Sequence, residues 1–482
     1  MQTTKPHAAL LASPGMGHFI PVLELGKRLV SEHGFNATVF VVTTDTSLSQ
    51  SQLLKKSHPI PKLLDIVLLP PVDISTLINP TTGILAQLAI MMRQALPSLR
   101  QAISAMKFCP TALIVDIFGT EAFAISEELN MLKYVFITST AWFLALTIHL
   151  PTLDAKVVEE EHVRNHEPLM IPGCSSVRFE DTFEPVLDRN NQMYIEYIRM
   201  GVQMPTADGI LVNTWQDLEP KTLGALGDKR KLGWVAQAPV YAVGPLVRPV
   251  KPGSSSDVLG WLDMQPQQSV VYVSFGSGGT LSAKQTTELA WGLELSEQRF
   301  IWVVRPPVED DAAAAIFKTG HRSDNTPDFL PDGFLTRNQK KGLVVPMWAP
   351  QTEILSHPSV GGFLSHCGWN STLESIVNGL PMIAWPLYAE QGMNATMLTE
   401  DIGVAVRLKS TPPVVVSREE IETTIRQVME DKGDAIRARA KTLKSSAEKA
   451  LSKGGSSYNS LSYVANDCEI RLRYIKTKAE GA

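Results

Sequence analysis

Short apolar segments recur along this chain, and stretches with helical spacing separate them. In the first half these segments are rich in β-branched residues; they are residues 7–13, 37–44, 65–70, 111–116, 133–138 and 208–214. A strand that is apolar along nearly its whole length must be covered on both faces, as in a parallel sheet between two layers of helices. The second half repeats the pattern at residues 270–277, 300–306, 343–348, 361–366, 381–386 and 404–408. This alternation predicts an α/β fold with two doubly wound parallel sheets.

The length of 482 residues indicates two domains, because single hydrophobic cores stop growing well below that size. Residues 245–257 are rich in Pro, Gly and Ser, a composition typical of a linker. We therefore expect a first domain at 1–245, a linker at 246–256 and a second domain at 257–455. Residues 306–328 lack a periodic pattern and predict a mobile surface loop.

Charge and cysteine content exclude several classes of protein. The net charge is −5, from 44 basic and 49 acidic residues, so we expect no nucleic-acid partner and no anionic membrane surface. The four cysteines form no CxxC pair, which indicates reduced thiols. The N-terminus lacks the apolar core of a signal peptide, and no stretch is long and apolar enough for a membrane span. We expect a cytoplasmic monomer.

The first apolar segment ends in SPGMGH, where Gly15 and Gly17 permit a tight turn into a helix. His18 then lies at the start of that helix, either as a capping or surface residue or as a general base. Asp116 ends the fourth segment, either as a cap or as the carboxylate partner of His18. No G-x-S-x-G elbow supplies an enzyme nucleophile, so a His–Asp pair here suits deprotonation of a substrate hydroxyl.

Two further segments end in groups that suit phosphate. FGSGG at 275–279 offers either backbone N–H donors or a plain tight turn. In HCGWNSTLE, His366 precedes a helix that begins near Asn370 and ends before Gly379. A helix N-terminus attracts anions through its unpaired N–H groups, and Glu374, four residues beyond Asn370, suits neutral hydroxyls such as a ribose diol. The alternative is an ordinary capped helix with Glu374 in solvent.

Trp348 ends another segment and is either a core residue or a platform on which a base stacks. Glu390 and Gln391 follow the apolar segment at 381–386, and they are either loop residues or ligands of sugar hydroxyls. The chain contains no HExxH motif, no Cys/His cluster, no Walker A loop and no Asp-x-Asp at a strand end. We therefore expect no metal and no permanently bound cofactor.

Residues 348–391, WAPQTEILSHPSVGGFLSHCGWNSTLESIVNGLPMIAWPLYAEQ, resemble the donor-binding signature of plant UDP-glycosyltransferases. The resemblance extends over the whole chain through TALIVD, GILVNTW, EPKTL, YVSFGSGG and WVVRPPV, and points to the branch that glucosylates coniferyl and sinapyl alcohols and related phenols. It implies two Rossmann-like domains facing a cleft (the GT-B fold), with the acceptor bound by the first domain and the donor by the second. It also implies that the helix at 456–482 packs back on the first domain.

The resemblance implies a set of donor-binding residues. Trp348 would stack on uracil with Ala349 beside it, and Gln351 would bind the ribose together with Glu374. The residues expected at the diphosphate are His366, Asn370 and Ser371, helped by Ser277. Those expected at the sugar are Trp369, Glu390 and Gln391, with Ser139 reaching it from the first domain. Gln391 is the residue that the family usually shows for UDP-glucose, although Glu390 stands where many members have Asp.

The implied reaction is direct displacement at the anomeric carbon, with His18 as base and Asp116 as its partner, giving a β-glucoside. The acceptor is expected to be a monolignol or related phenylpropanoid, with flavonols or simple phenols such as hydroquinone as alternatives. Aromatic and apolar residues that could line its pocket, or equally belong to the core, are Met16, Phe118, Trp142, Phe143 and Tyr388. Two rival functions are an NAD-dependent oxidoreductase, although both GxG turns lack the third Gly, and a non-catalytic UDP-sugar-binding protein.

Overall fold

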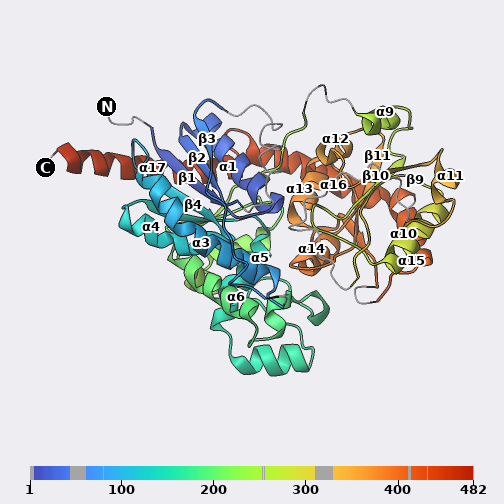
Figure 1. Ribbon diagram of the computed structural model, residues 1–482, viewed down its shortest axis with the longest axis horizontal. Coiled ribbons are helices and arrows are strands. Elements are labelled where there is room, and N and C mark those ends of the chain that lie inside the picture. The colour runs from blue at the N-terminus through green and yellow to red at the C-terminus, as the bar shows by residue number, and fades with distance from the viewer. Residues whose placement is uncertain are drawn as a thin grey trace. The chain divides into compact units, whose positions relative to one another are not determined.

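The computed structural model describes residues 5–43, 61–79, 81–251, 253, 256–309, 329–410, 414–430 and 433–480. The chain forms two compact units (Figure 1). Unit 1 comprises Met1–Phe179, Glu184–Val247 and Lys449–Ala482, and unit 2 comprises Glu180–Phe183 and Arg248–Glu448. The C-terminal segment lies in unit 1, where the resemblance placed it, but it joins that unit at Lys449, earlier than the expected residue 456. Unit 2 also takes four residues from the first half, which was not expected.

Unit 1 is built on a parallel sheet of seven strands in the order β3-β2-β1-β4-β5-β6-β7. The strands are β1 His7–Ala12, β2 Asn36–Val41, β3 Leu64–Leu68, β4 Ala112–Asp116, β5 Leu132–Ile137, β6 Gly209–Val212 and β7 Val240–Ala242. In the register of the sheet, Leu10 of β1 lies between Val39 of β2 and Ile114 of β4. The order reverses between β1 and β4, and ligands of such sheets bind at this reversal, beyond the carboxyl ends of the strands.

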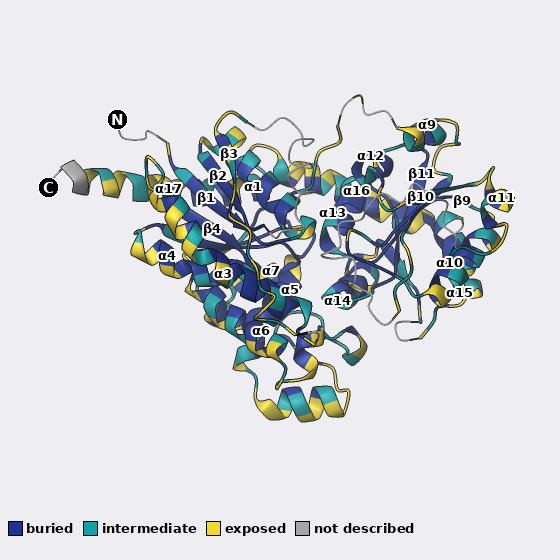
Figure 2. Ribbon diagram, viewed as in Figure 1, coloured by how far each residue is buried: buried dark blue, intermediate teal, exposed yellow. Residues whose placement is uncertain are grey.

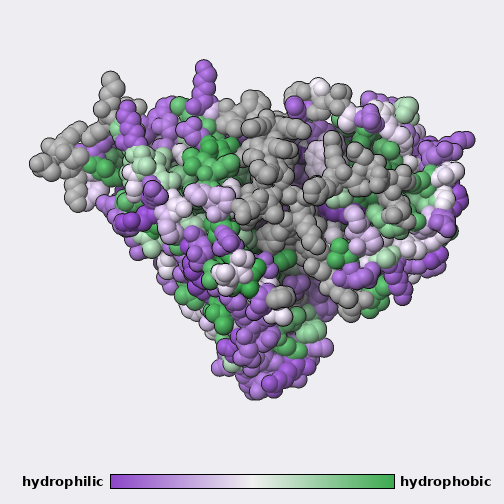
Figure 3. Space-filling view, in the orientation of Figure 1, coloured by the Kyte–Doolittle hydropathy of each residue, from purple (hydrophilic) through white to green (hydrophobic). Residues whose placement is uncertain are grey.

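Helices connect these strands. They are α1 Met16–His33, α3 Ile84–Ser104, α4 Phe123–Glu128, α5 Ala141–His149, α6 Gln192–Gln203, α7 Pro220–Gly227, α8 Gly233–Ala236 and α17 Ser456–Glu480, with 3₁₀ turns at η1 Ile117–Ala122, η2 Leu150–Thr152, η4 Phe179–Asp181, η5 Glu184–Leu187 and η6 Met204–Thr206. Helix α1 ends where Gly34 adopts a left-handed conformation (φ 74°) and donates its N–H to Leu29 O. The π-helical segment η3, Lys156–Arg164, is covered by hydrophilic side chains at the lower edge of unit 1 (Figure 3).

The C-terminal helix α17 completes the core of unit 1. Its Leu461, Val464 and Cys468 are fully buried in the same cluster as β1, β2 and α1. Hydrogen bonds attach the return of the chain: Arg28 donates to Leu451 O at 2.8 Å and Ser457 Oγ donates to Gly244 O at 2.6 Å. The last segment of the chain is therefore an integral part of unit 1.

Unit 2 repeats the architecture with six parallel strands in the order β10-β9-β8-β11-β12-β13. The strands are β8 Val270–Ser274, β9 Arg299–Val304, β10 Gly342–Pro346, β11 Val360–Ser365, β12 Met382–Ala384 and β13 Ala405–Arg407. The helices are α9 Asp257–Asp263, α10 Ala283–Leu295, α11 Phe334–Asn338, α12 Gln351–Leu355, α13 Trp369–Val377, α14 Gln391–Thr396, η7 Met397–Ile402, α15 Arg418–Met429 and α16 Gly433–Leu451, the last of which ends in unit 1. The central strands of both sheets, such as β4 and β8, are buried along their whole length (Figure 2).

The four residues that unit 2 takes from the first half are held by a buried ion pair. Asp181, with 1% of its side chain exposed, accepts from Arg407 at 2.5 Å and from Thr396 Oγ1 at 2.6 Å. A Cβ on Gly392 would lie 2.9 Å from Asp181 Cα, so only glycine leaves room for this segment. Nothing in the local sequence of 180–183 indicated this attachment.

The prediction of two doubly wound parallel sheets is confirmed, and the strand that sequence reasoning missed is β7. Most of the loop expected at 306–328 lies outside the described residues. Within the described ranges, no helix is both long enough and apolar enough to cross a bilayer. No disulfide joins the four cysteines.

Candidate active site

The reversal point of the unit 1 sheet brings His18 and Asp116 together. Because β1 and β4 are adjacent and parallel, the start of α1 and the end of β4 lie at one edge. His18 Nδ1 lies 3.1 Å from Asp116 Oδ2, with 24% of the His18 side chain exposed and Asp116 fully buried. A carboxylate accepts hydrogen bonds, so Nδ1 carries the proton and the lone pair of Nε2 is available to accept another.

Asp116 accepts from three further donors, which hold it rigidly. Its Oδ2 accepts from Ser13 N at 3.1 Å, and its Oδ1 accepts from Phe118 N at 3.2 Å and from Ser13 Oγ. Thr138 Oγ1 lies 3.3 Å from His18 Nδ1, the same atom that faces Asp116. Sequence reasoning missed Ser13 and Thr138, although they are the last residues of the strands predicted at 7–13 and 133–138 and directly follow β1 and β5 in the structure.

The residues proposed from sequence as an acceptor wall differ in burial. Trp142 and Phe143 of α5 are buried, and Phe143 stacks on Tyr197 with ring centroids 6.0 Å apart. Met16 and Phe118 are half-buried, and the Phe118 ring meets the His18 ring edge-on at 5.2 Å. Of the four wall residues proposed in unit 1, Met16 and Phe118 are therefore the two that stay partly exposed, and Phe118 lies against His18.

Two further predicted residues are Ser139, expected at the sugar, and Tyr388, expected in the acceptor wall. Ser139 is buried in the turn between β5 and α5, next to Thr140, whose hydroxyl caps α5 by accepting from Phe143 N at 2.9 Å. Tyr388 is half-buried in unit 2, in the loop that follows β12.

In unit 2, the carboxyl ends of the strands carry the predicted donor residues, because all strands of this sheet are parallel. Gln351 connects two others: its Nε2 donates to Ser371 Oγ at 3.0 Å and to Glu374 Oε2 at 2.7 Å. Burial raises the pKa of the Glu374 carboxyl, and the hydrogen bond from Gln351 opposes that rise. The structure thus brings Gln351, Ser371 and Glu374 into one polar cluster at the start of α13.

His366 lies in the turn before α13, with its ring between two glycines. A Cβ on Gly276 would lie 2.5 Å from its Cε1 and Nε2, and a Cβ on Gly368 would lie 2.4 Å from Nε2. Burial, together with the charge of Arg305, lowers the pKa of His366 to about 4, so the ring is neutral at neutral pH. Its Nδ1 is buried and has no hydrogen-bond partner among the described residues. His366 can therefore bind an anion as a neutral donor but not as a cation.

Trp348 lies in the turn after β10. The sequence predicted that the strand would run to residue 348, but β10 ends at Pro346. The side chain of Trp348 is 61% exposed, which is unusual for so large an apolar group, whereas Ala349 beside it is buried. Met347 before it has a φ of 64°, a backbone conformation uncommon for a side chain of that kind. The exposed indole is available as a stacking surface.

Gln391 begins α14 and organises the loop before it. Its Oε1 accepts from Leu387 N at 2.9 Å and from Tyr388 N at 3.1 Å, so both lone pairs of that oxygen are used and only its amide nitrogen can donate to a ligand. Glu390 precedes it and is half-buried, and Trp369 in the first turn of α13 is buried. Among the residues that the structure describes, no group of three or more His, Cys, Asp or Glu could hold a metal ion.

Known proteins resemble this chain closely. The family model described as UDP-glucoronosyl and UDP-glucosyl transferase matches residues 240–438. Anthocyanidin 3-O-glucosyltransferase 5 of Manihot esculenta is 57% identical over 97% of this chain and 96% of its own length. UDP-glycosyltransferase 72E1 of Arabidopsis thaliana is 53% identical over 100% of both chains. Hydroquinone glucosyltransferase of Rauvolfia serpentina is 44% identical over 97% of this chain and 98% of its own length.

Solved structures agree with these relatives. TcCGT1 in complex with UDP has a TM-score of 0.90 at 48% identity, covering 97% of this chain and 100% of that chain. Phytolacca americana UGT2, complexed with UDP-2fluoro-glucose and pterostilbene, has a TM-score of 0.84 at 40% identity, again covering 97% and 100%. The similarity therefore spans both units.

Proposed function

The chain belongs to the UDP-glycosyltransferase family, and from this premise we propose that it transfers glucose from UDP-glucose to a hydroxyl group of a small phenol. The observation that carries the proposal is the contact of His18 with Asp116, 3.1 Å from Nδ1 to Oδ2, which leaves Nε2 available as a base for a substrate hydroxyl.

The proposed donor site comprises the strand ends of unit 2. Trp348 stacks on uracil, and the Gln351–Glu374 pair binds the ribose hydroxyls. The diphosphate is bound at the start of α13 by its N–H groups, His366 and the hydroxyl of Ser371, with Asn370 and Ser277 as further donors. Trp369, Glu390, Gln391 and Ser139 contact the sugar. Exposure of Trp348 and the shared hydrogen bonds of Gln351 support this assignment.

In the proposed reaction, the acceptor hydroxyl gives its proton to His18 Nε2 while its oxygen bonds to the anomeric carbon. The bond from that carbon to the UDP oxygen breaks on the opposite face, so the α-linked donor gives a β-glucoside. Asp116 stabilises the imidazolium that forms, and the N-terminus of α13 stabilises the negative charge that develops on UDP. We propose that these groups suffice without a metal ion, and that addition of EDTA leaves the rate unchanged.

For the acceptor we propose a phenylpropanoid alcohol of the coniferyl or sinapyl type, with flavonols and simple phenols such as hydroquinone as alternatives. Support for a phenol comes from relatives named for an anthocyanidin and for hydroquinone, and from a similar protein solved with pterostilbene. Met16 and Phe118, half-buried in unit 1, offer apolar contacts for an aromatic ring. Trp142, Phe143 and Tyr388 remain proposed wall residues with less support. Trp142 and Phe143 are buried, and Tyr388 belongs to unit 2.

The test is a reaction of purified protein with UDP-glucose and one acceptor of each class, followed by UDP release and NMR of the product linkage. We expect a β-O-glucoside with the phenylpropanoid alcohol formed at the highest kcat/KM. Absence of UDP release with every acceptor, or binding of NADH in place of UDP, would reject the proposal. We further propose that the enzyme is a cytoplasmic monomer, which size-exclusion chromatography with light scattering and a fluorescent fusion would test.

A further inference from the structure

Arg305 directly follows β9 and is a cation with no carboxylate partner. Within the part of the chain that the structure describes, none of its hydrogen bonds or ion pairs involves an Asp or Glu. Two other arginines of unit 2 do have such partners: Arg337 binds Glu294 and Arg418 binds Glu288. Burial lowers the pKa of the Arg305 guanidinium, yet arginine remains charged at any physiological pH. A buried charge without an opposite charge beside it costs free energy, so a role for Arg305 has to be sought in what surrounds it.

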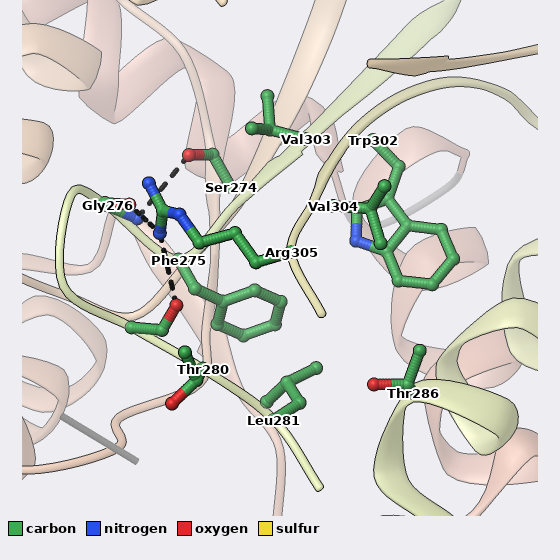
Figure 4. Close-up of a pocket in the computed structure, with 11 residues that line it drawn as sticks. Ser274, Phe275, Gly276, Thr280, Leu281, Thr286, Trp302, Val303, Val304 and Arg305 are labelled. Carbon is green, nitrogen blue, oxygen red and sulfur yellow. Dashed lines mark hydrogen bonds between the residues drawn. The ribbon is translucent and has the colours of Figure 1, made fainter. Parts of the chain in front are cut away.

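The guanidinium points instead at the backbone of the loop after β8 (Figure 4), and it also reaches the turn after β10. Its Nη1 donates to Gly276 O at 2.6 Å and to Gly279 O at 3.1 Å, both in the loop after β8. Its Nη2 donates to Met347 O at 3.4 Å, in the turn that carries Trp348. The same group also lines a cavity of about 20 Å³ beneath the loop, enough for one water molecule. Arg305 therefore connects the loop after β8 with the turn after β10.

These bonds orient the N–H groups of the loop. In a planar trans peptide the C=O and the following N–H point in opposite directions, so Ser277 N–H points away from Arg305 when Gly276 O points toward it. Ser277 is exposed, and its N–H has no partner among the described residues. The arrangement resembles other backbone sites for anions, in which unpaired N–H groups face outward from a tight turn.

The adjacent His366 cannot supply a positive charge. Its ring lies directly against Gly276, where a Cβ would be 2.5 Å away, and the nearby charge of Arg305 adds to burial in keeping the ring neutral. Its buried Nδ1 has no partner in the described chain. The site therefore contains neutral donors from the loop and from His366, together with one cation, Arg305, behind them.

We propose that Arg305 is the cation of the donor site: it positions the loop at residues 276–279, and its charge stabilises the diphosphate of the UDP-sugar. This inference rests on the proposed function, because the anion is the diphosphate assigned there. Arg305 is a positioning residue that acts through the loop and through its field, and no contact with the phosphates is required. Its position was visible in WVVRPP, where a basic residue ends an apolar strand at the ligand edge of the sheet.

The test separates charge from loop geometry by using two ligands and two substitutions. Binding of UDP and of uridine is measured by calorimetry at 50 and 300 mM NaCl for the wild type, R305K, R305Q and a control, R337Q, whose arginine lies on the surface of the same unit. Lysine keeps the charge, whereas glutamine keeps a donor for the loop carbonyls without charge. Circular dichroism and thermal unfolding of each variant verify that it folds.

We expect R305Q to lose UDP affinity by about 10- to 100-fold, the range for one charged interaction, while its uridine affinity changes less than twofold. R305K is expected to regain most of the loss, R337Q to match the wild type, and the salt dependence of UDP binding to be weaker in R305Q. An R305Q variant that keeps the wild-type ratio of UDP to uridine affinity, or an R305K variant as weak as R305Q, overturns the inference. If the wild type itself binds uridine as tightly as UDP, the proposed function fails, and the inference fails with it.

Discussion

Replacement of Asp116 by Asn tests the proposed base most directly, because it removes a charge and keeps the shape. Asp116 accepts from four donors: the Nδ1 of His18, the N–H and hydroxyl of Ser13, and the N–H of Phe118. An Asn side chain has only one acceptor oxygen. If the Asn oxygen replaces Oδ2, the N–H of Phe118 faces the amide NH₂ group. If the Asn oxygen replaces Oδ1, the NH₂ group faces the N–H of Ser13 and the Nδ1 of His18.

The magnitudes follow from these two orientations. In either one, a backbone N–H loses its acceptor, which costs about 1–3 kcal/mol of unfolding free energy. In the second one, His18 shifts its proton to Nε2 and cannot act as a base. Opposite unit charges about 4 Å apart interact by about 4 kcal/mol at an effective dielectric constant near 20. With the imidazolium half to fully formed in the transition state, about 2–4 kcal/mol is lost, so we expect kcat to fall about 30- to 1,000-fold.

The assay is kcat and KM for UDP-glucose with a fixed phenol, together with thermal unfolding. Asp73→Asn is a matched control, since Asp73 also accepts a backbone N–H, from Ser75 at 2.9 Å, but is exposed in a loop. KM for UDP-glucose is expected to stay within about twofold, because the proposed donor residues other than Ser139 belong to unit 2.

A double-mutant cycle with His18→Ala supplies the decisive comparison. Because Asp116 acts through His18, the double variant is expected to be no slower than His18→Ala alone, which should lose about 10²–10⁴ in rate. Losses that add on a logarithmic scale, or an Asp116→Asn enzyme with unchanged kcat, would falsify the reasoning. Phenols that are already ionised at the assay pH should show a smaller loss in both single variants.

Four further predictions follow from the unit 2 site and its supports. Trp348→Ala is expected to weaken UDP binding by about 1–3 kcal/mol in calorimetry with no drop in Tm, since the indole is 61% exposed; a large fall in Tm with unchanged affinity would mean that Trp348 is a structural residue. Because burial raises the pKa of Glu374, the folded state favours its protonated form, and stability is lost as pH rises from the unfolded pKa through the folded one. Glu374→Gln should therefore unfold at the same or higher Tm at pH 7.5 while binding UDP less tightly; a lower Tm contradicts this. The pKa of His366 is lowered to about 4, so its contribution to stability is complete above pH 6.5 and decreases as pH falls toward 4. His366→Gln should therefore flatten the dependence of Tm on pH between 7 and 4.5. An unchanged slope would refute the assignment. Asp181→Ala leaves Arg407 without its buried partner and should cost about 3–5 kcal/mol in denaturant unfolding of unit 2, whereas a loss below 1 kcal/mol would show the ion pair to be unimportant.

Local sequence determined the helices and strands, and it determined that the functional residues lie at the carboxyl edge of each sheet. Uniformly apolar segments at regular intervals specify buried parallel strands, and residues that follow such strands must lie at the carboxyl edge of the sheet. This reasoning is sufficient to place His18, Asp116, His366 and Trp348 at the ends of strands. It depends on spacing along the chain alone, which is why one sequence can supply it.

Only the tertiary structure decided which strand ends are neighbours. The contact between His18 and Asp116 requires β1 to lie beside β4, and strand order is set by packing between segments about a hundred residues apart. The same dependence hid the partners of Asp116 and the attachment of Asp181 to unit 2.

Burial was the other property that needed the fold. An aromatic residue at a strand or helix end has the same sequence signal whether it packs inward, as Trp142 does, or faces solvent, as Trp348 does. Charge compensation is likewise non-local: Arg305 is one arginine among many in the sequence, and only the arrangement of loops around it shows that its partners are carbonyl oxygens and that its charge remains to be matched. Pattern along a chain specifies elements, whereas the free energy of a buried charge depends on everything packed around it.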